Sequence, residues 1–309
     1  MLVELFQKRY LSNLNENYSL FYDDFHEYGN RATAKQAIYF IPGLNGVPGQ
    51  VRFAMPAIKK IFGKDVYIKC LYLDEFSAKK PIWEKYSLEN VEKKAATILA
   101  DLTNILRDFD DVIIFASSSG FYDFANAYGK GVDAFKDRLK LFWVACAPPQ
   151  FKAVRWQSLF YKVNGFEHQG YAWVAFPNMD FLRFIHSETS TKFKWKTQQG
   201  SKSLFKVDLE SRFRCGNSLW FYASIDCFNA CLAHAVRDQD FPLDVETYIL
   251  AANNDGYWDR APQDVMSAIL HRYVKSPKIL FKKTSHLWVA IPNNIVDLLQ
   301  MAVDSVTEF

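Results

Sequence analysis

Short apolar runs alternate with longer amphipathic segments along most of the chain. The apolar runs are bounded by glycine, proline or charged residues, which is typical of strands in a covered sheet. The predicted strands are Ala37 to Ile41, Val66 to Leu73, Val112 to Ala116, Leu139 to Ala147, Val245 to Ala252 and Lys278 to Lys282.

Between these runs, apolar residues recur at helical spacing and predict helices. The predicted helices are Phe53 to Phe62, Asn90 to Arg107, Phe121 to Tyr128, Gln263 to Tyr273 and about Asn294 to Val306. In the first of them, Pro56 is tolerated only if it falls in the first turn. Strands that alternate with helices predict an α/β fold, with a mainly parallel central sheet and helices on both of its faces.

Two segments do not follow this alternation. Residues 1–35 begin with helical spacing, and Tyr18 to Phe25 within them fits either a strand or a short helix. The stretch from Pro149 to Asp244 is rich in aromatic residues and breaks the pattern of strand and helix. We interpret it as a cap inserted over the carboxyl edge of the sheet. The predicted division is a core of residues 1–149 and 245–309, with residues 150–244 as the cap.

Composition adds limits on the protein class. Of the 309 residues, 50% are hydrophobic and 23% are charged, which is typical of a globular protein with a sizeable core. The net charge of +3 is too small to indicate a nucleic-acid partner. The five cysteines are odd in number and irregularly spaced, which favours a reducing compartment. Since the sequence shows no signal peptide and no apolar run of membrane length, we expect a cytoplasmic protein without a membrane span.

The most informative stretch follows the predicted strand at Val112 to Ala116. Three serines and a glycine come next, and a predicted helix follows them. Ser118 has small residues two places away on both sides, Ala116 and Gly120, as a nucleophile elbow requires. The tight turn of such an elbow exposes the serine oxygen at the edge of the sheet, beside the positive N-terminus of the helix. The alternative is an ordinary serine-rich loop or helix N-cap.

A serine nucleophile needs a base, and the base needs a carboxylate that fixes its tautomer. Asp255 follows the strand at Val245 to Ala252, and Asp259 in the same loop is the backup acid. His286 follows the strand at Lys278 to Lys282, whereas the other five histidines lie in the N-terminal segment, the cap or a helix. Serine, acid and histidine thus follow three different strands, in the chain order of the α/β topology. Alternatively, the two aspartates only cap the helix that follows them.

A serine site of this kind also needs two amide donors for the developing oxyanion. The backbone N–H of Ser119 would be one, since it lies at the start of the predicted helix. The other would come from the loop Pro42 to Gly49, most simply from Leu44. The glycines of this loop would let its backbone approach a substrate closely. Without a catalytic role, the loop would be a plain turn.

Together these segments resemble the α/β-hydrolase superfamily. The matching pieces are Ile38 to Gly43, Ala116 to Gly120, Asn254 to Gly256, and Ser285 with His286. The resemblance implies these roles: Ser118 as nucleophile, Asp255 as acid, His286 as base, and the amides of Leu44 and Ser119 as oxyanion donors.

The chain departs from the family pattern at several points. Pro42-Gly43 stands where members often have His-Gly, and Ala116 stands where the first elbow residue is often Gly. Ser117 and Ser119 replace the usual larger residues beside the nucleophile. The cap matches no subfamily pattern. The resemblance therefore implies a reaction family but not a substrate.

Three functions are compatible with these residues. The first is a serine hydrolase that cleaves a carboxylic ester or thioester through an acyl-enzyme intermediate. The second is an acyltransferase that uses the same triad and passes the acyl group to an alcohol or amine, which a cap that excludes water would favour. The third is a non-catalytic binding protein on the same fold, because a fold does not dictate a function.

The cap and the cysteines carry weaker signals about partners. Residues 151–240 hold twelve Lys and Arg against eight Asp and Glu, which would suit an acidic or carrier-linked acyl substrate. A solvated face over an aromatic core is the simpler interpretation. Cys227, Cys231 and His234 have helical spacing but no evident fourth ligand, so they are better interpreted as buried small side chains than as a metal site. We therefore expect a small-molecule acyl substrate, and no cofactor, metal or nucleic acid.

Overall fold

A computed structural model describes residues 26–43, 51, 54–73, 88–146, 241–253, 262–284, 289 and 292–307. The described strands form one seven-stranded sheet in the order β1-β3-β2-β4-β5-β6-β7. The strands are β1 (Glu27–Tyr28), β2 (Gln36–Ile41), β3 (Val66–Cys70), β4 (Val112–Ser117), β5 (Leu139–Val144), β6 (Glu246–Ala252) and β7 (Lys278–Lys282). The helices are α2 (Met55–Phe62), α4 (Leu88–Ile105), α5 (Gly120–Tyr128), α10 (Gln263–Leu270) and α11 (Pro292–Thr307), with a 3-10 helix η4 (Val132–Arg138).

The sheet is mainly parallel, which confirms the predicted fold class. Only the β1–β3 pair is antiparallel among the described strands. The other neighbours, from β3 through β7, all pair in parallel. The sequence pattern did not indicate β1, because a strand of two residues is too short to leave an apolar run of its own.

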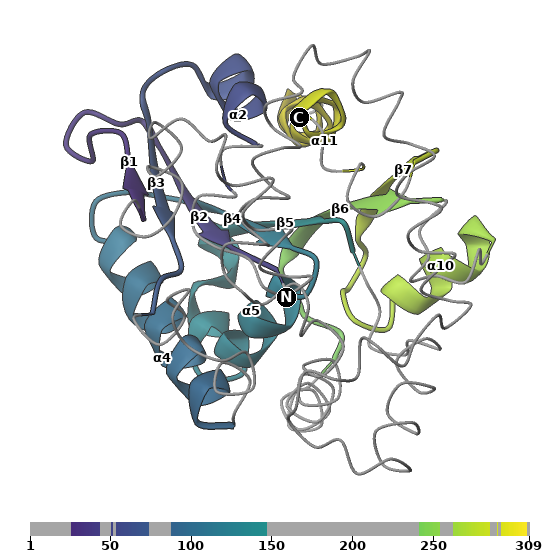
Figure 1. The fold of residues 1–309 in the computed structure, drawn as a ribbon, viewed down its shortest axis with the longest axis horizontal. Helices are drawn as coiled ribbons and strands as arrows, with labels where there is room; N and C mark the ends of the chain where they lie inside the picture. Colours follow the sequence, from purple (N-terminus) through teal and green to yellow (C-terminus); the bar gives the residue numbers. More distant parts are fainter. Residues whose placement is uncertain are drawn as a thin grey trace, which may run out of the picture.

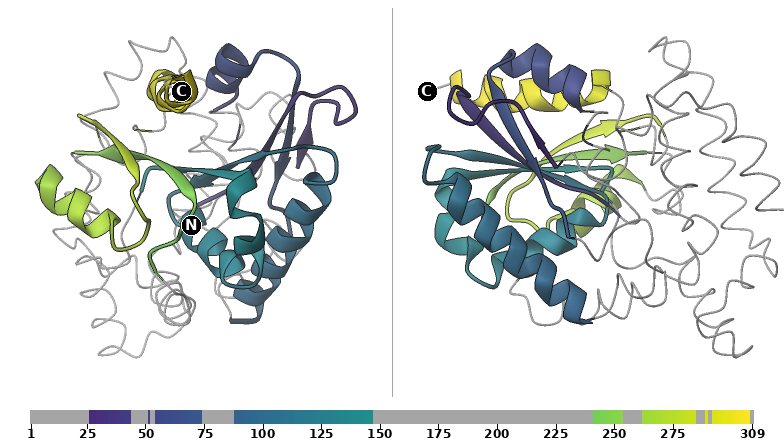
Figure 2. Two further views of the ribbon diagram at one scale, coloured as in Figure 1. Left: turned by 180° about the vertical axis from the view of Figure 1, so that it is seen from behind. Right: turned by 60° about the vertical axis from the view of Figure 1, so that its left-hand side comes forward.

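Helices cover both faces of the sheet (Figure 1). α4 and α5 pack on one face, and α2 and α11 pack on the other, as the edge-on view in Figure 2 shows. Successive residues of the central strands alternate between two apolar cores. Ile114 and Trp143 belong to the core under α4 and α5, whereas Phe115 and Phe142 belong to the core under α2 and α11. Strands covered on both faces need apolar residues throughout, which is why they appear in the sequence as continuous apolar runs.

Most predicted elements are confirmed, with shifts at their ends. α2 begins at Met55 and keeps Pro56 in its first turn, as expected. β3 ends at Cys70 rather than Leu73, and β5 ends at Val144. The second shift has a local cause, because Ala145 has a φ of 55° and so leaves the extended conformation.

The last two helices also differ from their predicted bounds. α10 ends at Leu270 instead of Tyr273, and the residues after it form turns. α11 runs from Pro292 to Thr307, slightly longer at both ends than the prediction. Helix ends depend on capping and on tertiary contacts, so periodicity places them only to within a few residues.

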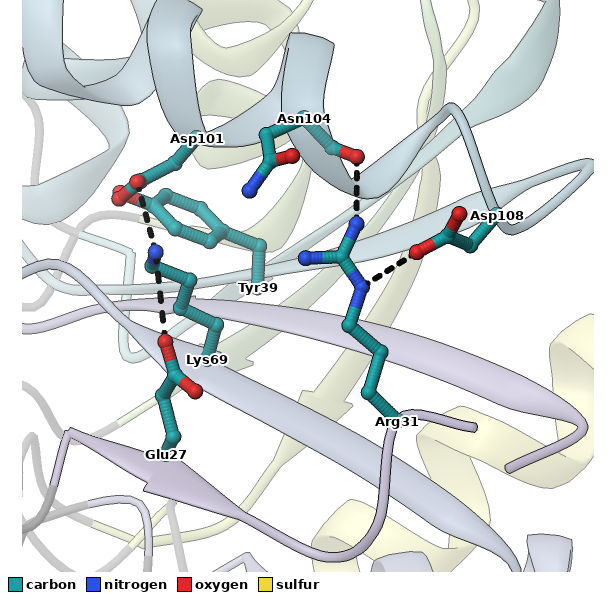
Figure 3. Close-up of polar contacts among 7 residues, drawn as sticks. All are labelled: Glu27, Arg31, Tyr39, Lys69, Asp101, Asn104 and Asp108. Carbon is teal, nitrogen blue, oxygen red and sulfur yellow. Dashed lines mark hydrogen bonds and ion pairs between the residues drawn. The ribbon is translucent and has the colours of Figure 1, made fainter. Parts of the chain in front are cut away.

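Polar contacts hold α4 against the β1–β3 edge of the sheet (Figure 3). The carboxylate of Asp101 accepts a hydrogen bond from the buried hydroxyl of Tyr39 at 2.8 Å and pairs with the ammonium of Lys69 at 2.9 Å. The same ammonium lies 3.4 Å from the carboxylate of Glu27. Burial, followed by the charge of Asp101, raises the pKa of Tyr39 well above its usual range. These opposite charges satisfy one another, so the cluster fixes a helix in place.

A second set of contacts holds the end of the same helix. The guanidinium of Arg31 lies 2.6 Å from the carboxylate of Asp108 and donates to the carbonyl of Asn104 at 2.6 Å (Figure 3). Asn104 and Asp108 lie at the C-terminus of α4 and just beyond it. A cation at that position also complements the negative end of the helix dipole.

The predicted cap falls almost entirely outside the described residues, so the domain division stays a prediction. Near the end of the predicted cap, Leu243 is described. Its side chain is fully buried, and its backbone forms an isolated parallel β-bridge with Val274. The helical spacing at the start of the chain and the open assignment of Tyr18 to Phe25 also fall outside the described residues. Within the described part of the chain, no helix is both long enough and apolar enough to cross a bilayer.

Candidate active site

Ser118 lies in a strained turn between β4 and α5. β4 ends at Ser117 and α5 begins at Gly120, so the predicted succession of strand, turn and helix is confirmed. Ser118 has a φ of 50°, in the left-handed region that L-residues other than Gly, Asn and Asp seldom occupy. Such strain persists only where the surrounding structure enforces it, and it is concentrated at functional sites. Ser118 therefore has the backbone conformation expected of a nucleophile elbow.

The neighbouring strand β5 holds both peptide groups of Ser118. Its backbone N–H donates to the carbonyl of Val144 at 2.7 Å, which extends the β4–β5 ladder by one residue. Its carbonyl accepts a hydrogen bond from the indole N–H of Trp143 at 2.8 Å. Two adjacent residues of one buried strand thus hold both the amide and the carbonyl of Ser118.

The backbone atoms around Gly120 leave no room for a side chain at this position. A Cβ atom there would lie 2.6 Å from the carbonyl oxygen of Ile41 and 2.8 Å from that of Pro42. Both distances are far below a normal van der Waals contact. On the other side of the serine, Ala116 is fully buried between β2 and β5. The expected need for a small residue is therefore confirmed at Gly120.

The loop after β2 reaches the same turn. A Cβ atom on Gly43 would lie 2.8 Å from the carbonyl oxygen of Ser117 and 3.1 Å from the Cβ of Ser118. This proximity follows from the strand order, since β2 pairs with β3 on one side and with β4 on the other. Ligand sites in such sheets lie at the carboxyl ends of the strands, where the connections depart in opposite directions.

The electrostatics at the start of α5 suit a developing anion. Ser119 is the N-terminal cap position of α5, so its backbone N–H lies at the positive end of the helix dipole. Leu44, the other expected oxyanion donor, lies outside the described residues and directly follows Gly43. The role of both amides stays a prediction.

The acid and the base are predicted to follow β6 and β7. β6 ends at Ala252, three residues before Asp255, and β7 ends at Lys282, four residues before His286. Both strands run parallel to β4, so these ends lie on the same edge of the sheet as Ser118. Asp255, His286 and the backup acid Asp259 all lie outside the described residues, and their roles stay predictions.

A buried ion pair supports the helix of the elbow. The ammonium of Lys94 on α4 donates to the carboxylate of Asp123 on α5 at 2.8 Å, and both side chains are largely buried. Burial raises the pKa of Asp123, while Lys94 acts in the opposite direction. Nearby, the side chain of Asn126 donates to the backbone carbonyl of Val91 at 3.3 Å. These contacts fix the elbow helix against α4.

A hollow of about 350 Å³ lies at the opposite edge of the sheet, where β4, β5 and β6 begin. Some of its charged side chains pair with one another; for example, Lys136 lies 2.8 Å from Asp244. The described residues contain no group of three or more His, Cys, Asp or Glu side chains placed to hold a metal ion. The carboxyl edge near Ser118 is therefore the better candidate for chemistry.

No protein-family model matches this chain, and no curated protein matches it by sequence. Several solved structures match its fold. A candidate acyltransferase from Salmonella enterica has a TM-score of 0.55 and 12% sequence identity, with 88% of this chain and 89% of that chain covered. A laboratory-evolved variant of potato epoxide hydrolase has a TM-score of 0.53 and 13% identity, with 92% of this chain and 95% of that chain covered.

The chain has the α/β-hydrolase fold. The resemblance based on the elbow and the strand pattern is thereby confirmed at the level of the fold. One of the two solved structures is named as an epoxide hydrolase and the other as an acyltransferase. The shared fold therefore leaves the subfamily open. The chemistry has to be inferred from the residues at the elbow.

One contact at this site has no signal in the sequence. Trp143 lies in the middle of an apolar strand, where a tryptophan is normal core material. Nothing in its sequence context indicates that its N–H contacts the carbonyl of Ser118.

Proposed function

We propose that the protein is a serine hydrolase that cleaves a carboxylic ester or thioester through an acyl-enzyme intermediate. The observation that carries this proposal is the strained backbone of Ser118 at the N-terminal end of α5, with Gly43 packed against it. A serine held in such a turn at the carboxyl edge of a parallel sheet is the arrangement of a nucleophile elbow.

In this mechanism, His286 takes the proton from Ser118 as the serine oxygen attacks the carbonyl carbon. The backbone amides of Leu44 and Ser119 hold the resulting oxyanion. The tetrahedral intermediate collapses to the acyl-enzyme, and His286 gives its proton to the leaving alcohol or thiol. Water then attacks the acyl-enzyme with His286 as base, which regenerates Ser118. Asp255 orients the imidazole and stabilises its positive charge.

The identity of the nucleophile separates acyl substrates from epoxides. A serine oxygen that opened an epoxide would form an ether, which water cannot cleave with only a histidine base. The enzyme would then stop after one turnover. An acyl-enzyme is an ester, and the same base can complete its hydrolysis. Ser118 therefore favours an acyl substrate, free or carrier-linked, although a potato epoxide hydrolase shares the fold.

The proposal is tested with a fluorophosphonate probe and a short p-nitrophenyl ester. We expect the wild type to be labelled at Ser118 and Ser118→Ala to lose both labelling and ester hydrolysis. Ser117→Ala is the matched control, because it removes a neighbouring hydroxyl and should still be labelled. Equal labelling of the wild type and Ser118→Ala would show that the mechanism is wrong.

Product analysis distinguishes hydrolysis from acyl transfer, since both pathways share the acyl-enzyme. Hydrolysis predicts the free acid as the product in the presence of added alcohols and amines. If the esters or amides of those acceptors predominate instead, the protein is an acyltransferase that uses the same residues.

A further inference from the structure

Trp143 donates a hydrogen bond to the backbone of the candidate nucleophile. It lies on β5 beside Ala116 of β4, and its side chain is fully buried. Its indole N–H donates to the backbone carbonyl of Ser118 at 2.8 Å. The indole also stacks on Phe121, with 3.9 Å between ring centroids and planes 10° apart. Tyr122 packs edge-on against the same indole at 6.0 Å.

The position of Ser118 explains why its carbonyl pairs with a side chain. Ser118 precedes Ser119, the N-cap residue of α5, so its carbonyl lies outside the hydrogen-bond ladder of that helix. The amide of Tyr122 donates to the carbonyl of Ser119, at 3.0 Å. The left-handed φ of Ser118 has turned its carbonyl toward β5, where Trp143 supplies a donor. A carbonyl left unpaired in this setting would destabilise the turn.

We propose that Trp143 is a positioning residue for Ser118. The indole N–H fixes the carbonyl of the nucleophile, and the carbonyl of Val144 fixes its amide. With both flanking peptide groups held, the Cα–Cβ bond of Ser118 has one direction, and its oxygen is presented at the edge of the sheet. This inference rests on the proposed role of Ser118 as nucleophile.

The rings around Trp143 make it suited to this task. Phe121 and Tyr122 contact it from the first turn of the elbow helix, so the indole packs directly against that helix. A misplacement of about 1 Å at a reacting group can lower a rate about 100-fold. Loss of the N–H should therefore affect catalysis more strongly than it affects folding.

Trp143→Phe tests the inference, because it retains an aromatic ring in the stack and removes the donor. For p-nitrophenyl ester hydrolysis we expect kcat to fall about 10- to 100-fold, with KM changed less than about threefold. Fluorophosphonate labelling of Ser118 should slow to the same extent. Thermal denaturation of the same samples measures the structural part of the effect.

Tyr128→Phe is the matched control. It also removes a side-chain donor to a backbone carbonyl, since the hydroxyl of Tyr128 donates to the carbonyl of Asp244 at 2.9 Å. That bond lies at the opposite edge of the sheet. We expect Tyr128→Phe to lower Tm by a similar amount and to keep the wild-type kcat. If both variants keep the wild-type kcat, or if both lose it in proportion to Tm, the positioning role is overturned.

A second variant separates the hydrogen bond from the shape of the ring. Site-specific incorporation of 3-benzothienylalanine at position 143 replaces the N–H by sulfur and keeps the size of the indole. A fall in kcat like that of Trp143→Phe supports the proposal, and wild-type kcat overturns it, even if Trp143→Phe fails to fold. If wild-type activity does not depend on Ser118, the proposed function and this inference both fail. If it does, and position 143 has no effect, only this inference fails.

Discussion

Gly120→Ala tests how closely the elbow helix packs on the loop after β2. The new Cβ would lie 2.6 Å from the carbonyl oxygen of Ile41 and 2.8 Å from that of Pro42. Because both atoms belong to the backbone, neither can rotate away as a flexible side chain would. The helix or the end of β2 has to move.

Two effects of this substitution oppose each other. Alanine is the better helix former by about 0.5–1 kcal/mol, which would stabilise α5. Overpacking at a tightly filled site costs about 1–3 kcal/mol. The steric term is the larger, so we expect a net loss of about 1–2 kcal/mol in the free energy of unfolding. For a domain of this size, that corresponds to a fall in Tm of about 2–8 °C.

The loss of activity should exceed the loss of stability. Movement of α5 away from Pro42 would change the spacing between Gly43 and Ser118, where the oxyanion is expected to form. We predict a fall in kcat/KM of at least about tenfold, measured with a p-nitrophenyl ester at a temperature where the variant is folded. Circular dichroism during thermal denaturation gives the change in Tm.

Gly63→Ala is the matched control for this prediction. A Cβ at Gly63 meets no atom within 4 Å, although its φ of 78° makes any side chain strained. It should therefore lower stability by about 1–3 kcal/mol and leave kcat/KM unchanged. If Gly120→Ala raises Tm and keeps full activity, helix propensity outweighs sterics, and the tight contact with Ile41 and Pro42 is not required.

Two further predictions address the same region. Gly43→Ala would place its Cβ 3.1 Å from the Cβ of Ser118, so fluorophosphonate labelling should slow about tenfold or more; an unchanged rate would contradict the role of this loop. Lys94→Met should destabilise the fold by about 3 kcal/mol at pH 7, because it leaves the buried carboxylate of Asp123 unpaired. Burial raises the pKa of Asp123, so the folded state holds the proton of this carboxyl more tightly than the unfolded state does. The free energy of unfolding therefore falls as pH rises through that pKa. Loss of Lys94 removes a charge that lowers the pKa of Asp123, and so raises this pKa further. Urea unfolding should therefore show a smaller loss at pH 5 than at pH 7, with the exposed Lys93→Met as control; equal losses at both pH values would contradict this account.

The elbow could be predicted from the sequence because its signals are local. An apolar run, three serines, a glycine and an amphipathic helix follow one another within residues 112–128. Each signal reports burial or turn geometry over a few residues, and the structure has β4, the turn and α5 at these positions. The same local reasoning predicted the parallel sheet, since strands separated by helices cannot pair as simple hairpins.

Contacts between distant segments were decided by the tertiary structure alone. Gly43 and Ser118 meet because β2 pairs with β4, although more than 70 residues separate them in the chain. Hydrophobic periodicity shows that a strand is buried, but it does not identify the partner strand. The antiparallel edge strand β1 was missed for a related reason, because its place depends on pairing with β3.

The polar contacts show the same division between local and distant information. In the sequence, Lys94 and Asp123 are two charges on two helices, and Trp143 is an apolar residue of a strand. Lys94 and Asp123 form an ion pair only because α4 packs against α5. Trp143 donates to Ser118 only because β5 lies beside the elbow. The sequence by itself thus determined which residue is the candidate nucleophile, because turn chemistry is local. The tertiary structure decided what holds that residue in place, because each holding contact joins segments far apart in the chain.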